Sequence, residues 1–266
     1  IENEPIESID LMERAAMTVT RWIAGHFLSE KKVKVFVGPG NNGGDGLAVA
    51  RQLTEFDFKT EVFLVRISDK LSKDAEINLE RLKKLDSVSI HEIVSGKDFP
   101  EIDLNDIIVD ALFGSGLSRK LEGLPAKLVK HLNRSEAKIV AIDIPSGLFG
   151  EDNKSNDRGS IIKATYTLTF QMPNLSFFLP ENESFVGKWK VLPIGLMKEA
   201  IDSIDSNYFM FTKKDISKKI IHRSKFSHKG TFGHVMLIAG SYGKMGAAAL
   251  SARACLRTGC GMVTVH

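Results

Sequence analysis

The sequence predicts a three-layer α/β fold built around a mostly parallel β-sheet. Short apolar segments rich in β-branched residues alternate with amphipathic helical segments from Val33 onward, which is the pattern of successive βαβ units. Three of the predicted strands run, after Val37, Val109 and Ile142, directly into glycine, Asn, Asp or Ser. Because ligands bind beyond the carboxyl ends of parallel strands, we expect these three strand ends to meet in one site.

Each predicted element has a local signal. An apolar stripe at helical spacing predicts a first helix over 7–27. Ser72 is a typical N-cap for a helix over 72–85, and Pro125 suits the first turn of a helix over 125–133. The expected strands are 33–37, 60–65, 88–94, 106–110, 138–142, 165–170 and 188–192.

The stretch GPGNNGGDG, residues 38–46, links the first strand to its helix. Its glycines let the backbone approach a ligand closely, and the helix N-terminus that follows attracts an anion. Gly38, Gly40 and Gly43 satisfy the dinucleotide fingerprint, which is a weak match by itself. Because Arg66 ends the next strand and suits a 2′-phosphate, an NADP-dependent oxidoreductase is one open interpretation.

Polar side chains in the same stretch argue against that interpretation. Asn41, Asn42 and Asp45 stand where a dinucleotide-binding fold presents bare backbone to pyrophosphate. Asp45 also has a structural interpretation, since Asp is a preferred helix cap. The whole string is far more specific than its fingerprint glycines, and it predicts a nucleotide or phosphate site.

Asp110 and Asp143 each follow a buried strand, and either carboxylate can have a purely structural role in a turn. Ser146 and Gly147 are open to the same interpretation. They do not form a nucleophile elbow, because Ile144 stands where that motif needs a second glycine. No His suits a catalytic triad either, and we therefore exclude a hydrolase triad.

Composition narrows the class of protein. The 266 residues are 43% hydrophobic and 26% charged with a net charge of +3, as in an ordinary globular protein, and no basic block predicts nucleic-acid binding. Cys255 and Cys260 form neither a disulfide framework nor a metal motif, which favours a reducing, cytoplasmic location. The sequence shows neither a long apolar span nor a signal peptide, so it gives no prediction of membrane association. The chain begins at Ile1 without an initiator methionine, which is typical of a trimmed sequence.

Four sequence motifs occur in a recognisable order. They are LMERAA (11–16), GPGNNGGDGLAVARQL (38–53), IIVDALFGSGL (107–117) and AIDIPSGL (141–148). Together they resemble the NAD(P)H-hydrate epimerase family, the YjeF N-terminal domain. The resemblance implies a Rossmann-like three-layer domain over 1–205 that interconverts the R and S forms of hydrated NADH and NADPH, its small-molecule substrates. It also implies a homo-oligomer, with the first helix as a candidate interface.

The resemblance further implies a set of site residues. Asp143 would face the hydrated nicotinamide ring as the catalytic acid/base. A potassium ion would be held by Asn42, Asp110 and Ser146. The substrate-binding residues would be Asn41, Asn42, Gly43, Gly44, Asp45, Gly114, Ser115, Gly116, Leu117, Ser118, Arg119, Lys120 and Asp143.

The remaining segment, 206–266, is similar to the opening of the ribokinase-like, ADP-dependent NAD(P)H-hydrate dehydratase domain. Ala247 there would match a substrate contact, although the glycine-rich loop before it can equally be a simple connection. The later motifs that bind ADP or ATP are absent before His266, so we expect a truncated, incomplete dehydratase segment and a chain that epimerises without dehydrating. A third interpretation, a non-catalytic binding module, is disfavoured because the acidic and amide positions are intact.

Overall fold

The computed structural model describes residues 6–68, 70–220 and 222–266. Ile1, where the predicted first domain begins, lies outside the described residues. The chain divides into two compact units, Ile1–Ile204 and Asp205–His266. Which activity belongs to each unit stays a prediction at this point.

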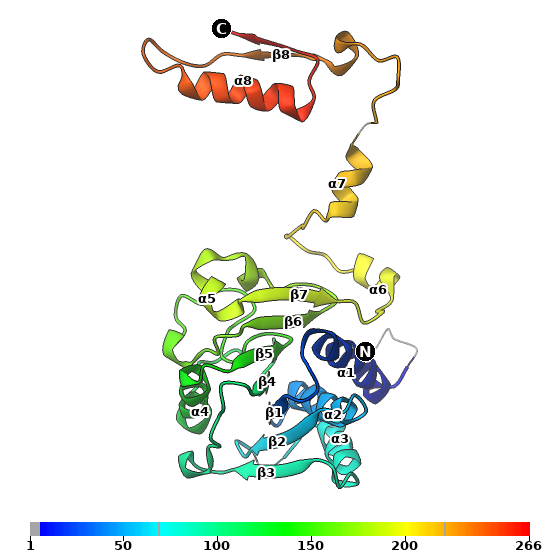
Figure 1. Cartoon of the computed structure of the whole chain (residues 1–266), viewed down its shortest axis with the longest axis vertical. Helices are drawn as coiled ribbons and strands as arrows, with labels where there is room; N and C mark the ends of the chain where they lie inside the picture. Colours follow the sequence, from blue (N-terminus) through cyan, green and yellow to red (C-terminus); the bar gives the residue numbers. More distant parts are fainter. Residues whose placement is uncertain (1–5, 69, 221) are drawn as a thin grey trace. The chain divides into compact units, whose positions relative to one another are not determined.

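The first unit contains a seven-stranded, fully parallel sheet in the order β3-β2-β1-β4-β5-β6-β7, which confirms the predicted fold class. The outer half towards β3 comes from the first three strands, and the chain then returns past β1 to build the other half (Figure 1). The strands are β1 (Lys32–Val37), β2 (Lys59–Val65), β3 (Ser89–Ile93), β4 (Ile107–Ala111), β5 (Lys138–Ile142), β6 (Tyr166–Phe170) and β7 (Lys188–Leu192).

Helices cover both faces of this sheet (Figure 1). Alternate side chains of a strand point to opposite faces, so Val35 packs with α1, α2 and α3 whereas Phe36 packs with α4. Both residues are fully buried, which explains the unbroken apolar sequence of β1. The helices are α1 (Ser8–His26), α2 (Asn41–Thr54), α3 (Lys73–Lys83), α4 (Gly123–Arg134), the short α5 (Glu183–Val186) and α6 (Lys198–Asp202).

The strands β1, β4 and β5 are neighbours in the sheet, so their carboxyl ends lie side by side. This confirms that the three polar strand ends share one rim. The structure differs from expectation at the first of them, because α2 already begins at Asn41 and most of the glycine-rich stretch is helical. The helix packs closely here, so these positions need glycine: a Cβ on Gly43 would lie 1.9 Å from the Gly38 carbonyl oxygen, and one on Gly44 would lie 2.8 Å from the Met12 sulfur.

The second unit contains α7 (Lys213–Lys219) and a βαβ segment made of β8 (His234–Leu237), α8 (Gly246–Thr258) and β9 (Met262–Val265). The strands β8 and β9 pair in parallel, as the alternating pattern predicts. Across the described parts of both units, no helix is long and apolar enough to span a bilayer.

Candidate active site

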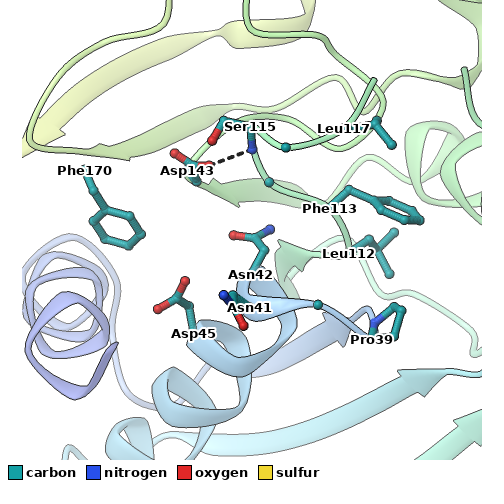
Figure 2. A pocket seen from close by; sticks show the side chains of 13 residues that line it. Pro39, Asn41, Asn42, Asp45, Leu112, Phe113, Ser115, Leu117, Asp143 and Phe170 are labelled. Carbon is teal, nitrogen blue, oxygen red and sulfur yellow. Dashed lines mark hydrogen bonds between the residues drawn. The ribbon is translucent and has the colours of Figure 1, made fainter. Parts of the chain in front are cut away.

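A cavity of about 650 Å³ opens at the rim where β1, β4 and β5 end (Figure 2). Four segments line it: residues 39–42 and Asp45 after β1, residues 112–117 after β4, Asp143 after β5, and Phe170 at the end of β6. Segments far apart in the sequence therefore meet around one hollow, as expected for a parallel α/β sheet.

The first turns of α2 bring Asn42 and Asp45 to the cavity (Figure 2). Asn42 is only 8% exposed, yet neither its amide nitrogen nor its amide oxygen has a hydrogen-bond partner among the described residues. Asp45 is half-buried, and its carboxyl group points into the hollow. A buried polar group without a hydrogen-bond partner lowers the stability of the fold, and a ligand bound in the cavity would supply the missing partners of these side chains.

Asp143 approaches the same hollow from the end of β5. Its φ of 66° lies in the left-handed region, which Asp tolerates better than most residues. The Ser115 backbone N–H donates a 2.8 Å hydrogen bond to one carboxylate oxygen of Asp143 (Figure 2). A Cβ on Gly114 would lie 3.0 Å from that oxygen and 3.3 Å from the Asn42 Cβ, so the glycine allows the Asp143 and Asn42 segments to approach each other.

Asp110 and Ser146 form a hydrogen-bonded pair behind the cavity, outside its lining. The Ser146 hydroxyl donates to Asp110 at 2.6 Å, and the Ser146 backbone N–H donates to the other carboxylate oxygen at 2.8 Å. The Leu112 N–H also donates to Asp110, and the Phe113 N–H donates to the Ser146 hydroxyl oxygen. Both side chains are fully buried, and the pair fixes the β4 and β5 loops to each other.

Burial changes the acidity of two carboxyl groups. Burial raises the pKa of Asp110 to about 6, although the hydrogen bonds from Ser146 and Leu112 act in the opposite direction. Burial also raises the pKa of Asp45 well above its usual range, and the negative charges of Asp143 and Asp74 raise this pKa further. Carboxyl groups with raised pKa values are typical of acid–base sites.

Ser118, Arg119 and Lys120 lie outside the first cavity and line a neighbouring one of about 530 Å³. Phe113 and Leu117 line both cavities, so the loop after β4 separates them.

Three of the residues that the resemblance implicated lie elsewhere. Gly43 and Gly44 are buried in packing contacts of α2 and do not line either cavity. Ala247 belongs to the second unit, where it is exposed near the start of α8. Sequence reasoning also missed Phe170 as a lining residue, although it ends a strand of the same sheet.

Two alternatives from the sequence do not fit the geometry. Gly40 is the N-cap of α2, so the interpretation of Asp45 as a helix cap is wrong. Arg66 pairs with Glu92 and lines neither cavity, which weakens its assignment to a cofactor phosphate.

The family model for the YjeF-related protein N-terminus matches residues 8–176, a range that contains every residue of the main cavity. The chain belongs to this YjeF-related family. It is 36% identical to the NAD(P)H-hydrate epimerase of Oenococcus oeni over 72% of this chain and 88% of that protein. It is also 34% identical to the bifunctional NAD(P)H-hydrate repair enzyme Nnr of Moorella thermoacetica over 97% of this chain and 50% of that protein.

The chain thus spans about half the length of several curated relatives that it matches. A solved structure supports the architecture independently. The crystal structure of yeast ynu0, YNL200c, superposes with a TM-score of 0.57 at 24% identity, covering 71% of this chain and 79% of the yeast chain. That degree of identity supports the shared fold alone.

Proposed function

We propose that this chain interconverts the R and S forms of hydrated NADH and NADPH. The observation that carries the proposal is the cavity, where the amides of Asn41 and Asn42 and the carboxyl groups of Asp45 and Asp143 converge. It occurs in a family one of whose relatives is named NAD(P)H-hydrate epimerase, and the match covers most of that relative.

The chemistry follows from the substrate. The hydrated ring carries a hydroxyl group on the carbon beside the ring nitrogen. Protonation lets this group leave as water, because the nitrogen lone pair stabilises the resulting cation, and water then adds to the opposite face. A positioned carboxyl group can supply and remove these protons, and Asp143, which lines the cavity, is the acid/base that the family resemblance implies.

A potassium ion suits this site. Asn42 has a buried amide oxygen without a partner, and Asp110 and Ser146 offer further oxygen atoms, the ligand type that hard cations prefer. We therefore infer that Asn42, Asp110 and Ser146 hold the ion. Its charge would favour the ionised form of Asp110 and offset the negative charge of the site and its substrate.

The second unit is proposed to be the beginning of an ADP-dependent dehydratase segment. Support comes from the bifunctional relatives, whose match to this chain extends over 97% of it. In that assignment, ADP or ATP serves the dehydratase portion of a longer protein and not the epimerase cavity. A homo-oligomeric state and a cytoplasmic location are part of the same proposal.

The test is chromatographic. The purified chain receives one separated epimer of hydrated NADPH, and the appearance of the other epimer is followed in potassium and in lithium buffers. We expect interconversion far above the spontaneous rate, and faster in potassium. Equal rates with and without protein would contradict the proposed function, whereas equal acceleration in both salts would contradict only the ion site.

A further inference from the structure

Two carboxyl groups enter the main cavity, and they come from different sides of it. Asp45 projects from α2, whereas Asp143 projects from the end of β5, and the Asn42 side chain lies between them (Figure 2). The family resemblance accounts for one acid/base group at the ring, Asp143. It gives Asp45 no chemical role beyond contact with the substrate.

A hydrogen bond from the loop after β4 positions Asp143 at the cavity. The Ser115 N–H donates to its carboxylate at 2.8 Å. The left-handed backbone at Asp143 and the 2.8 Å hydrogen bond from its own N–H to the Leu168 carbonyl oxygen hold the group in place.

The surroundings of Asp45 favour its neutral form. Within the described part of the chain, no donor forms a hydrogen bond to its carboxyl group. The charged groups that act on it are Asp143, across the cavity, and Asp74 of α3, and both are negative. Asp74 is itself buried and accepts a 2.6 Å hydrogen bond from the Ser8 hydroxyl, which holds its carboxyl group in place. A carboxyl group with a raised pKa is suited to donate a proton, and two carboxyl groups that line one cavity can serve as an acid–base pair.

We propose that Asp45 is a second catalytic carboxyl group, which exchanges protons with the ring hydroxyl on the face opposite Asp143. This inference rests on the proposed epimerase function and deepens it. The site then works as a two-carboxyl epimerase, with one group for each face of the hydrated ring.

Each step balances. The proton of Asp45 passes to the hydroxyl oxygen of one epimer, the carbon–oxygen bond breaks with its electron pair on oxygen, and water leaves. The nitrogen lone pair forms a carbon–nitrogen double bond. Water then forms a new carbon–oxygen bond on the Asp143 face, the double-bond pair returns to nitrogen, and the surplus proton of that water passes to Asp143. The product state has Asp45 ionised and Asp143 protonated, which is the state that the reverse direction needs.

The proposal is tested with Asp45→Asn and Asp143→Asn in the full chain, using each separated epimer of hydrated NADPH in ¹⁸O-labelled water. Inversion is followed by chromatography and label uptake by mass spectrometry, with the spontaneous rates subtracted. We expect each substitution to slow inversion by about 100-fold or more, which is the scale of general acid–base catalysis. Each variant should still exchange the oxygen of one epimer without inverting it, and that epimer should differ between the two variants.

A structural role for Asp45 makes different predictions. The proposal would be overturned if Asp45→Asn inverted its substrate within about threefold of the wild-type rate. It would also be overturned if both variants exchanged the oxygen of the same epimer, or if Asp45→Asn exchanged the oxygen of neither epimer. Thermal unfolding of each variant, with the exposed Asp86→Asn as a matched control, identifies damage to the fold. If the wild-type chain itself neither inverts nor exchanges, the epimerase function fails as a whole. If the wild type inverts its substrate and Asp45→Asn remains active, only the proposed role of Asp45 is rejected, and the epimerase function stands.

Discussion

The segments that follow β1 and β5 both carry polar side chains, but these side chains lack hydrogen-bond partners after β1 and have them after β5. After β1, the buried Asn42 amide and the Asp45 carboxyl group lack hydrogen-bond partners within the described residues. After β5, the polar side chains are bonded: Asp143 to the Ser115 N–H, and Ser146 to both Asp110 and Phe113.

This difference separates two kinds of functional residue. An unpartnered buried polar group lowers stability by about 1–3 kcal/mol, and a bound ligand at the cavity can supply the missing partner. Partnered groups instead fix the geometry against which the ligand lies. We therefore expect substitutions after β1 to impair function and spare stability, and substitutions of the bonded groups behind the cavity to impair stability as well.

The largest effect is expected for Asp143→Asn, which is nearly isosteric and cannot exchange a proton. Inversion of hydrated NADPH should fall by a factor of about 10²–10⁴, the usual contribution of a general acid–base group. Substrate affinity, measured by calorimetry, should change little. An unchanged rate would remove Asp143 from the chemistry.

The next effect concerns backbone strain after β5. Gly147 has a φ of 96°, and a Cβ there would lie 2.3 Å from the Ser160 carbonyl oxygen. We expect Gly147→Ala to lower the free energy of unfolding by about 4 kcal/mol, measured by urea denaturation. Gly40→Ala is the matched control after β1, since its Cβ would meet nothing within 4 Å, and equal losses in the two variants would contradict this account.

A smaller effect distinguishes the two segments most clearly. Ser146→Ala should lower the free energy of unfolding by about 2 kcal/mol, because it removes one hydrogen bond to the buried Asp110 and leaves the Phe113 N–H without its acceptor. Asn42→Leu should keep or raise stability, since it replaces an unpartnered amide by an apolar group of similar size, yet it should abolish the response of inversion to potassium. Destabilisation by Asn42→Leu as large as that by Ser146→Ala would contradict the comparison.

The smallest effect is a pH-dependent gain in stability for Asp45→Asn. Below the ordinary pKa of 3.8, Asp45 is protonated in the folded and unfolded chain, and the substitution has no electrostatic effect. As the pH rises towards the raised folded pKa, only the unfolded chain releases its proton, so the wild type loses stability and the variant does not. Thermal unfolding should show a larger advantage of Asp45→Asn at pH 8 than at pH 4, and an advantage that shrinks with rising pH would refute the assignment.

Much of the fold was predictable because the apolar pattern is strong. The β-branched runs at β1, β4 and β5 are buried on both faces, and parallel topology then places their polar ends on one rim. The start of α2 was not predictable, because helix propensity disfavours glycine, and the close packing that requires glycine at positions 43 and 44 is visible only in the folded chain.

The site was predictable in its residue types more than in its geometry. Local sequence pointed to Asp143 and to the glycine-rich stretch, but the hydrogen bonds between Asp110 and Ser146 join residues 36 apart and depend on the neighbouring positions of β4 and β5. Phe170 lines the cavity because β6 lies beside β5 in the sheet, and nothing in its local sequence indicates this position. The raised pKa of Asp45 depends on burial and on the charges of Asp143 and Asp74, which only the folded chain brings together.

The most direct test of this account is a crystal structure of the Asp143→Asn chain with one separated epimer of hydrated NADPH bound. The account predicts that the hydroxyl-bearing carbon lies in the main cavity, with residue 143 near one face of the ring and the Asp45 carboxyl group near the other. A ring bound outside this cavity, or with both residues on the same face, would contradict it.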